Sequence, residues 1–403
     1  MKKILAICLV LLLALSLLTA CTTTGNSGKD GGTTATGDNT QNKYTKNKLA
    51  VSIPLTGANM QYGISYKNAL QMAVNKFNEA GGLNGVMVEL EIYDDKTDQI
   101  EAINVANKII EDPKVFAVIG SFGSAISMAC APVYEDAKMP FISPNTSHID
   151  FPGMGEYMIP ISPVATVEMT AAAELISTRF NNADMAIFHY NTDLGVTNAK
   201  ILTEKYTERG GKVILTENYV PGETRDFTPT LSKIKEAKPK VIYVNGTYSD
   251  VAALLIQAHQ LGMEEFQFVC AGDVLKKEFL DLVGTKADGL IICATTPVYT
   301  DELMTPDAFD QVVVDFMKDY NKLYGPASVC DGFAACAYDG AMLAMKAALN
   351  VGTNDAAALI KEITTMDYIA VSGVDFRYTN GNNVYKGAIT YTVENGQFKA
   401  LGK

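Results

Sequence analysis

The segment from Val118 to Ser124 combines residue types that are suited to holding an anion. It contains Gly120 and Gly123, which let backbone amides approach a ligand, and it ends at Ser124, where a helix is expected to begin. Free N–H groups and the helix dipole favour a negative group at such an end. We therefore expect Ser124 to help hold a ligand carboxylate; the alternative is that Ser124 is only an N-cap.

A second polar segment, Ser143–Ser147, directly follows the next expected strand and includes Asn145, Thr146 and Ser147. It should lie at the same sheet edge as Ser124, so together they predict a cradle for an α-carboxylate and an α-amino group. Asp273 follows another expected strand, 267–270, and could pair with an ammonium from an opposing lobe. The alternative for Asp273 is an aspartate that only solvates its loop.

Aromatic residues are expected to complete this site. Tyr62 and Phe333 each stand at the start of an expected helix, and Phe122 lies between the two glycines of the first polar segment. These rings could close over an apolar ligand side chain, although aromatic residues at helical spacing more often pack in a core.

The chain offers no convincing catalytic set, and we expect a binding protein rather than an enzyme. His148, His189 and His259 are its only histidines, and the common nucleophile, phosphate-loop and dinucleotide motifs are absent from the sequence. The cysteines beyond residue 21 form no CxxC pair, so we expect buried free thiols, no metal and no cofactor. A disulfide among those cysteines is the alternative.

Alternating strands and helices are expected to position the site residues. The first half reads as strands near 48–53, 88–92, 115–119 and 140–143, with helices near 62–79, 100–110 and from 124. After about Val164 the alternation restarts, with helices at 166–179, 198–209, 228–237 and 250–261 between strands at 185–189, 212–216, 241–244, 267–270 and 289–293. A helical section, 309–349, and β structure, 373–398, follow. This pattern predicts an α/β protein with two doubly wound, Rossmann-like lobes, whose strand ends line one cleft.

The N-terminus reads as an export signal that ends in a lipidation site. Lys2 and Lys3 precede an apolar run at 4–18, and Leu-Thr-Ala leads directly to Cys21. We expect residues 1–20 to be a signal peptide, Cys21 to be acylated, and 21–47 to be a flexible linker. The alternative is a cleaved signal without a lipid. Loss of the two lysines takes the net charge from −12 to −14, which disfavours nucleic acid as a partner.

Several short motifs occur in one order along the chain from about Leu49: Tyr62-Gly63, Tyr93-Asp-Asp95, Val118-Ile-Gly120, Pro140-Phe-Ile-Ser-Pro144, Asp226-Phe227 and Ala258–Gly262. In these motifs the chain resembles the leucine/isoleucine/valine-binding proteins, type I periplasmic solute-binding receptors of ABC importers. The resemblance implies ligand contacts by the residues matching Tyr62, Ser124, Asn145, Ser147 and Phe333. The family's ammonium-binding acid falls on Gly272, with Asp273 next to it, and two further pocket aromatics fall on Leu194 and Thr247.

The resemblance also implies three crossovers between the lobes, near Val164, Ala294 and Ser372. We therefore expect one lobe from 48–164 plus 295–372 and the other from 165–294 plus 373–403. The expected function is an extracytoplasmic, lipid-anchored monomer that binds an amino acid with a branched-chain or other apolar side chain and serves a membrane ABC permease. The alternatives are a surface lipoprotein that reports a ligand to a signalling receptor, and a binder of amides or nucleosides.

Overall fold

The protein is described here by a computed structural model, which covers residues 44–295, 311–325, 330–373, 375–379, 382–384 and 389–401. The expected signal peptide, Cys21 and most of the expected linker lie outside these residues. Tyr44 is buried, and its hydroxyl donates a hydrogen bond to the carbonyl of Ala348 at 3.2 Å. The described fold therefore includes a few residues before Lys48.

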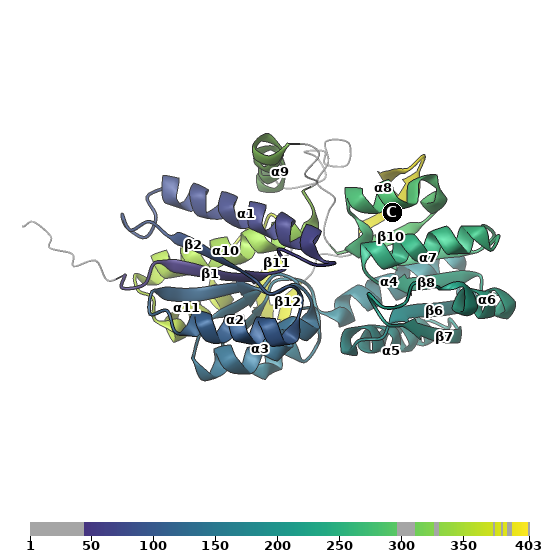
Figure 1. Ribbon diagram of the computed structural model, residues 1–403, viewed down its shortest axis with the longest axis horizontal. Coiled ribbons are helices and arrows are strands. Elements are labelled where there is room, and N and C mark those ends of the chain that lie inside the picture. The colour runs from purple at the N-terminus through teal and green to yellow at the C-terminus, as the bar shows by residue number, and fades with distance from the viewer. Residues whose placement is uncertain are drawn as a thin grey trace, which may run out of the picture. The chain divides into compact units, whose positions relative to one another are not determined.

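The first lobe is built on a parallel sheet with the strand order β2-β1-β3-β4-β5. Helices α1 and α10 cover one face and α2 and α3 cover the other (Figure 1). The bounds are β1 Lys48–Ile53, α1 Met60–Glu79, β2 Glu89–Asp94, α2 Gln99–Ile110, β3 Val115–Gly120, α3 Ser124–Asp136, β4 Phe141–Ser143, β5 Met158–Pro160 and α10 Gly332–Val351, with a short 3-10 turn at Phe151–Met154.

The two faces of this sheet follow from the alternation of side chains along its strands. Leu49 and Val51 of β1 pack under α1 and α10, whereas Ala50 packs under α2 and α3. Helix α1 passes very close to the end of β1, because a Cβ on Gly63 would lie 1.7 Å from the carbonyl oxygen of Pro54. Only glycine allows this approach, which brings the neighbouring Tyr62 to the edge where the strands end.

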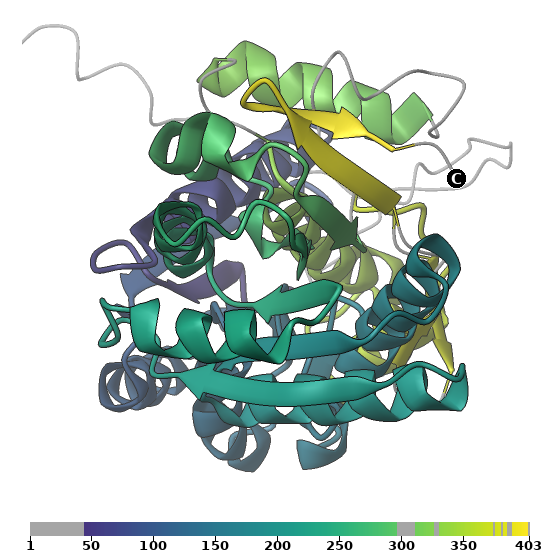
Figure 2. The same ribbon diagram turned by 90° about the vertical axis from the view of Figure 1, so that its right-hand side faces the viewer.

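The second lobe has a sheet with the order β14-β13-β10-β9-β8-β6-β7, in which β13 and β14 are antiparallel additions. In Figure 2 this C-terminal hairpin is the yellow pair of strands. The bounds are α4 Ala165–Phe180, β6 Met185–Tyr190, α5 Asp193–Glu208, β7 Val213–Tyr219, α6 Thr228–Ala237, β8 Val241–Asn245, α7 Tyr248–Gln260, β9 Gln267–Ala271, α8 Lys277–Val283, β10 Ile291–Ala294, β13 Ile389–Glu394 and β14 Gln397–Ala400, with 3-10 turns at Gly272–Val274 and Gly284–Ala287.

The chain passes from the first sheet to the second after β5 and returns to the first lobe after β10. Helices α9 Gln311–Tyr324 and α11 Ala356–Thr365 pack with α1 and α10, and β11 Asp375–Thr379 pairs with β12 Asn382–Val384 in a separate ribbon. The chain then rejoins the second sheet at β13. The predicted architecture of two α/β lobes is confirmed.

The structure differs from the predicted elements in several places. Helix α5 begins at Asp193 rather than Asn198, because Thr192 caps it by accepting a hydrogen bond from the amide of Gly195 at 3.1 Å. Gly195 and the polar residues around it suggested a loop instead. The helical section expected over 309–349 consists of two helices, α9 and α10, and Phe333 lies at the start of the second, as expected. The short elements β5, α8 and α11 were not expected.

Cys130, Cys270, Cys293, Cys330 and Cys336 are buried free thiols, as predicted. Among the described residues, none of the helices has the length and apolar character needed to cross a membrane.

Candidate functional site

A cavity lies between the strand ends of the two lobes. The first lobe contributes the loop after β4, the segment after β5 and the start of α10; the second contributes the first turn of α4, the ends of β6 and β9, and α5. The residues lining it are Pro144, Asn145, Ser147, Ser162, Pro163, Glu168, Tyr190, Leu194, Asn198, Gly272, Asp273, Leu275, Thr295, Asp331, Gly332, Phe333 and Cys336. This is the edge at which open α/β sheets bind ligands.

Half of the predicted site residues line this cavity. Asn145 and Ser147 reach it from the loop after β4, and Phe333 reaches it from the start of α10. Leu194 and Asp273 line it from the second lobe. The structure therefore brings the predicted polar loop and the predicted acid to one cavity, from opposite sides.

Ser124 and Thr146 do not line the cavity and support the polar loop from behind. Ser124 accepts a hydrogen bond from the amide of His148 at 3.3 Å, and the hydroxyl of Thr146 is hydrogen-bonded to that of Ser143. Both side chains are at least nine-tenths buried. Their contacts shape the loop that carries Asn145 and Ser147.

Tyr62 and Phe122 belong to an aromatic cluster beside the cavity rather than to its lining. Their rings are stacked with centroids 4.1 Å apart, and Tyr62 also meets Phe333 and Tyr248 edge to face at 5.1 and 5.5 Å. The Tyr62 hydroxyl donates to the carbonyl of Asp273 at 3.3 Å and accepts from the amide of Tyr248 at 3.4 Å. Tyr62 thus joins the first lobe to the second.

Thr247 also lies outside the cavity lining. It precedes α7, and its hydroxyl donates a hydrogen bond to the carboxylate of Asp250 at 3.1 Å. The structure shows this threonine as part of the entry into the helix.

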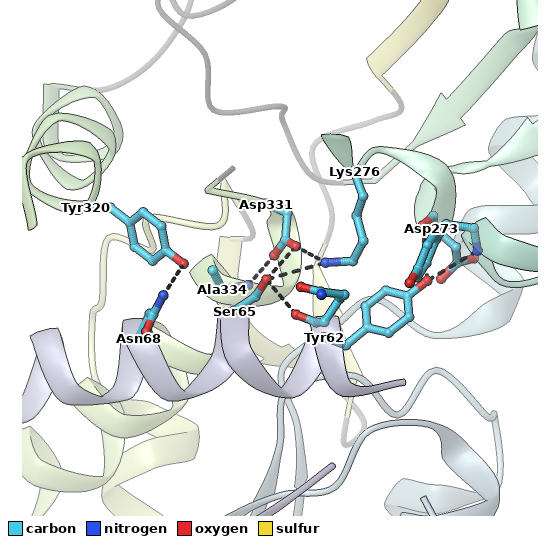
Figure 3. A network of polar contacts seen from close by, with 10 residues as sticks. Tyr62, Ser65, Asn68, Asp273, Lys276, Tyr320, Asp331 and Ala334 are labelled. Carbon is cyan, nitrogen blue, oxygen red and sulfur yellow. Dashed lines mark hydrogen bonds and ion pairs between the residues drawn. The ribbon is translucent and has the colours of Figure 1, made fainter. Parts of the chain in front are cut away.

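A buried ion pair that the sequence did not predict also joins the lobes. Lys276, just before α8, pairs with the Asp331 carboxylate, and each side chain is only 2% exposed (Figure 3). Asp331 also accepts from the Ser65 hydroxyl at 3.0 Å and caps α10 by accepting from the amide of Ala334 at 2.8 Å. The Lys276 ammonium lies 4.3 Å from the ring centroid of Tyr62, in a cation–π contact.

Two other acids of the cavity, Asp273 and Glu168, have raised pKa values, because burial disfavours the charged form of each carboxyl group. Burial raises the pKa of Asp273 to about 6, although the Lys276 ammonium partly opposes this shift. Burial also raises the pKa of Glu168 to about 8, and the Asp273 charge adds to the effect. Among the described residues, neither carboxylate forms an ion pair. A cation entering the cavity would favour the ionised form of both groups.

Sequence reasoning missed Glu168, Ser162 and Asn198. Glu168 lies in the first turn of a helix, where an acid is ordinarily explained by the helix dipole. Ser162 lies in an irregular segment, and Asn198 lies on a helix whose start was placed wrongly. The position of Glu168 could have suggested a role in the site. It follows the expected crossover near Val164, and residues beside a crossover between lobes lie close to the cleft.

Gly272 shows why the second-lobe acid is found one residue later. A Cβ on Gly272 would lie 3.1 Å from the Cβ of Ala294 on the neighbouring strand, which leaves little room for a side chain. Asp273, the residue after Gly272, instead brings a carboxylate to this part of the cavity wall.

Comparison with known proteins identifies the family. Residues 46–397 match a family model described as Periplasmic binding protein. The chain belongs to this family. The predicted resemblance to leucine/isoleucine/valine-binding proteins and the predicted type I periplasmic binding protein fold are confirmed.

Relatives within the periplasmic binding proteins include amino-acid binders. The chain is 28% identical to a leucine-, isoleucine-, valine-, threonine- and alanine-binding protein of Pseudomonas aeruginosa, over 68% of this chain and 72% of that protein. A leucine-binding protein structure from Thermotoga maritima is 25% identical with a TM-score of 0.78, covering 88% of this chain and 97% of that one. A Streptococcus pneumoniae branched-chain amino-acid binding protein, solved with isoleucine, shares the fold at 23% identity and a TM-score of 0.79, over 88% of this chain and 99% of that one.

Proposed function

We propose that this protein is the extracytoplasmic receptor of an ABC importer and that it binds an amino acid in the cavity between its lobes. The observation that carries the proposal is the placement of Asn145 and Ser147 on one side of the cavity and Asp273 on the other. An α-amino acid carries one anionic and one cationic group a short distance apart, so it matches a polar loop facing a carboxylate.

Each wall has a role in this proposal. The amide of Asn145, the hydroxyl of Ser147 and the backbone of their loop hold the α-carboxylate. Asp273 pairs with the α-ammonium, and Leu194 and Leu275 contact the aliphatic part of the ligand. Ser124 and Thr146 act indirectly by fixing the loop, and Tyr62, supported by Phe122, contacts the second lobe. Thr247 lies at the start of α7 and has no direct role in binding.

The activity is binding rather than turnover. The periplasmic binding proteins bind solutes and are not enzymes. No group of three or more potential metal ligands occurs in the part of the chain that the structure describes. Release of the ligand to a membrane permease would then be the productive step.

The proposal includes the N-terminal anchor and the lobe boundaries. Acylation of Cys21 would hold the receptor at the membrane surface, with residues up to about 47 as its tether. The lobes would comprise 48–164 plus 295–372 and 165–294 plus 373–403, and they would close as a monomer around hinges near Val164, Ala294 and Ser372. The side-chain class of the ligand is addressed in the next subsection.

Thermal-shift measurements test the amino-acid assignment. The full-length protein, purified in detergent, is unfolded and refolded to remove carried ligand, then heated with each standard amino acid, short amides, nucleosides and sugars. A ligand at 1,000 times its Kd stabilises the fold by about 4 kcal/mol. We expect a shift of several degrees with at least one amino acid; shifts confined to nucleosides or sugars, or none at all, would refute the assignment.

A further inference from the structure

Glu168 occupies a part of the cavity wall to which neither the ammonium nor the carboxylate of an amino acid is assigned. It lies in the first turn of α4, and its Oε1 accepts a hydrogen bond from the hydroxyl of Thr295 at 3.1 Å. Asp273 lines the same cavity and already supplies the carboxylate that a single ammonium requires. Apart from Asp331, which is paired with Lys276, Glu168 is therefore a second acid in a site whose ligand ammonium requires only one.

Two other residues of the same lining have buried polar atoms that form no hydrogen bond with a described residue. The side-chain oxygen Oδ1 of Asn198 and the hydroxyl of Ser162 form no hydrogen bond with any described residue. Asn198 and Ser162 are 3% and 8% exposed, and both line the cavity with Glu168. Buried polar groups are normally hydrogen-bonded, so these atoms indicate that a ligand completes the site.

An aliphatic ligand side chain would leave these groups as they are. Leucine or valine could contact Leu194 and Leu275, but neither could donate a hydrogen bond to Glu168 or Asn198. A site whose polar groups lose their partners discriminates strongly against the ligand that lacks them. The lining thus matches a ligand that brings a donor.

On this basis we propose that Glu168 determines specificity by accepting a hydrogen bond from the ligand's side chain, so that the receptor takes amino acids whose side chain carries an N–H or O–H group. This inference rests on the proposed function, because it assumes that Asp273 and the polar loop hold the α-ammonium and α-carboxylate. It replaces the apolar side chain that the sequence suggested. Burial raises the pKa of Glu168 to about 8, and a hydrogen bond donated by the ligand would favour its ionised form.

Pairs of amino acids with nearly the same shape provide the test. Threonine and valine differ by a hydroxyl in place of a methyl, and asparagine and leucine differ by an amide in place of an isopropyl group. Isothermal titration of the full-length protein in detergent, refolded to remove carried ligand, measures Kd for both pairs, with glutamine, arginine and lysine as further donors. We expect at least one donor to bind tenfold or more tightly than valine and leucine.

Two variants connect the preference to Glu168. In Glu168→Met the preference should disappear while the affinity for the apolar partner is kept or improved. Glu168→Gln keeps an acceptor oxygen and should retain most of the preference. If Glu168→Met does not fold, Glu168→Leu takes its place, because it also removes the acceptor. Circular dichroism establishes folding of each.

The outcomes separate the two claims. If amino acids bind but valine and leucine match or exceed every donor, or if the variant without an acceptor keeps the full preference, the role of Glu168 is refuted and the proposed function stands. If no amino acid binds the wild-type protein, the proposed function fails and this inference fails with it.

Discussion

Two regions join the lobes of this protein, and they differ in whether their charged groups have a partner within the protein. Around Lys276, the ammonium pairs with Asp331, contacts the Tyr62 ring and lies near the Ser65 hydroxyl, and the ion pair is almost fully buried. Around Asp273 and Glu168, the carboxylates face a cavity and form no ion pair with a described residue. The charges of the first region are paired within the protein, whereas the acids of the second region can gain partners only from a ligand.

The comparison indicates a division of labour between closing and recognition. A buried ion pair between the lobes favours one arrangement of them, but it does not distinguish one ligand from another. An unpartnered acid in a cavity gains its partner only when the ligand binds, so it contributes selectivity. Variants that alter each region separately test this distinction.

The largest expected effect comes from leaving the Asp331 charge without its partner. Lys276→Met should lower the free energy of unfolding by about 3–5 kcal/mol, because an uncompensated charge remains buried. The double variant Lys276→Met/Asp331→Asn should recover most of this loss, since asparagine retains the N-cap without the charge. Urea unfolding measures both.

Lys277→Met is the matched control for this prediction. Lys277 pairs with Asp281 on the surface, with side chains 48% and 58% exposed. Its removal should change stability by less than about 1 kcal/mol. Equal losses for Lys276→Met and Lys277→Met would contradict the structural role of the buried pair.

Removing the charge of Asp273 should affect binding rather than stability. Asp273→Asn is expected to weaken binding of the best amino acid by about 100-fold, because a charge-assisted hydrogen bond contributes about 1.5–3 kcal/mol. Isothermal titration provides the measurement, with Asp281→Asn as a control that keeps wild-type affinity. An unchanged Kd in Asp273→Asn would place the ammonium elsewhere.

Much of this fold was predictable from the sequence, because strand and helix periodicity is a local property. The helix expected near 62–79 is present as α1, and its buried side chains include Ala69, Met72, Ala73 and Phe77 at three- and four-residue steps. The polar loop at 145–147 was also found, since it directly follows a strand. Local patterns therefore located one wall of the cavity.

The rest depended on contacts between distant segments. Lys276 and Asp331 are 55 residues apart and lie on different lobes, so no spacing in the sequence relates them. Glu168 resembled an ordinary helix-start acid, and the aromatic residues Tyr62 and Phe122 resembled pocket residues although they pack beside the cavity. Only the folded arrangement separates these possibilities.

The affinity for an amino acid should decrease in acid as Asp273 becomes protonated. Its pKa in the unligated protein is raised to about 6, so the carboxylate is charged above that pH and neutral below it. Bound ammonium favours the charged form, so binding should be about tenfold weaker at pH 5 than at pH 7. Several ionisable groups interact with Asp273: Lys276, Glu168, Cys270, Tyr62, Tyr66, Tyr190, Tyr219 and Tyr243.

Titrations at several pH values in the wild-type protein and in Asp273→Asn test this prediction. The variant lacks the titrating carboxyl, so its weaker affinity should vary little over the same range. Parallel acid dependence in both proteins would assign the effect to another group.

The smallest effect is expected for the hydroxyl that connects the two regions. Tyr62→Phe removes the hydrogen bonds to the Asp273 carbonyl and from the Tyr248 amide but keeps the ring under Lys276. A typical hydrogen bond contributes about 0.5–1.5 kcal/mol, so a loss of stability of about 1 kcal/mol is expected in urea unfolding. A loss as large as that of Lys276→Met would show that the two contacts are not separable.

In the proposed function, the cavity holds the α-ammonium and α-carboxylate of one amino acid from opposite lobes. Titration of the refolded wild-type protein with its best amino acid, and with the N-acetyl and carboxamide forms of that amino acid, tests the claim directly. We predict that either modification weakens binding by 100-fold or more, because each removes one of the two charges. Retention of full affinity by the N-acetyl or the carboxamide form would contradict the account.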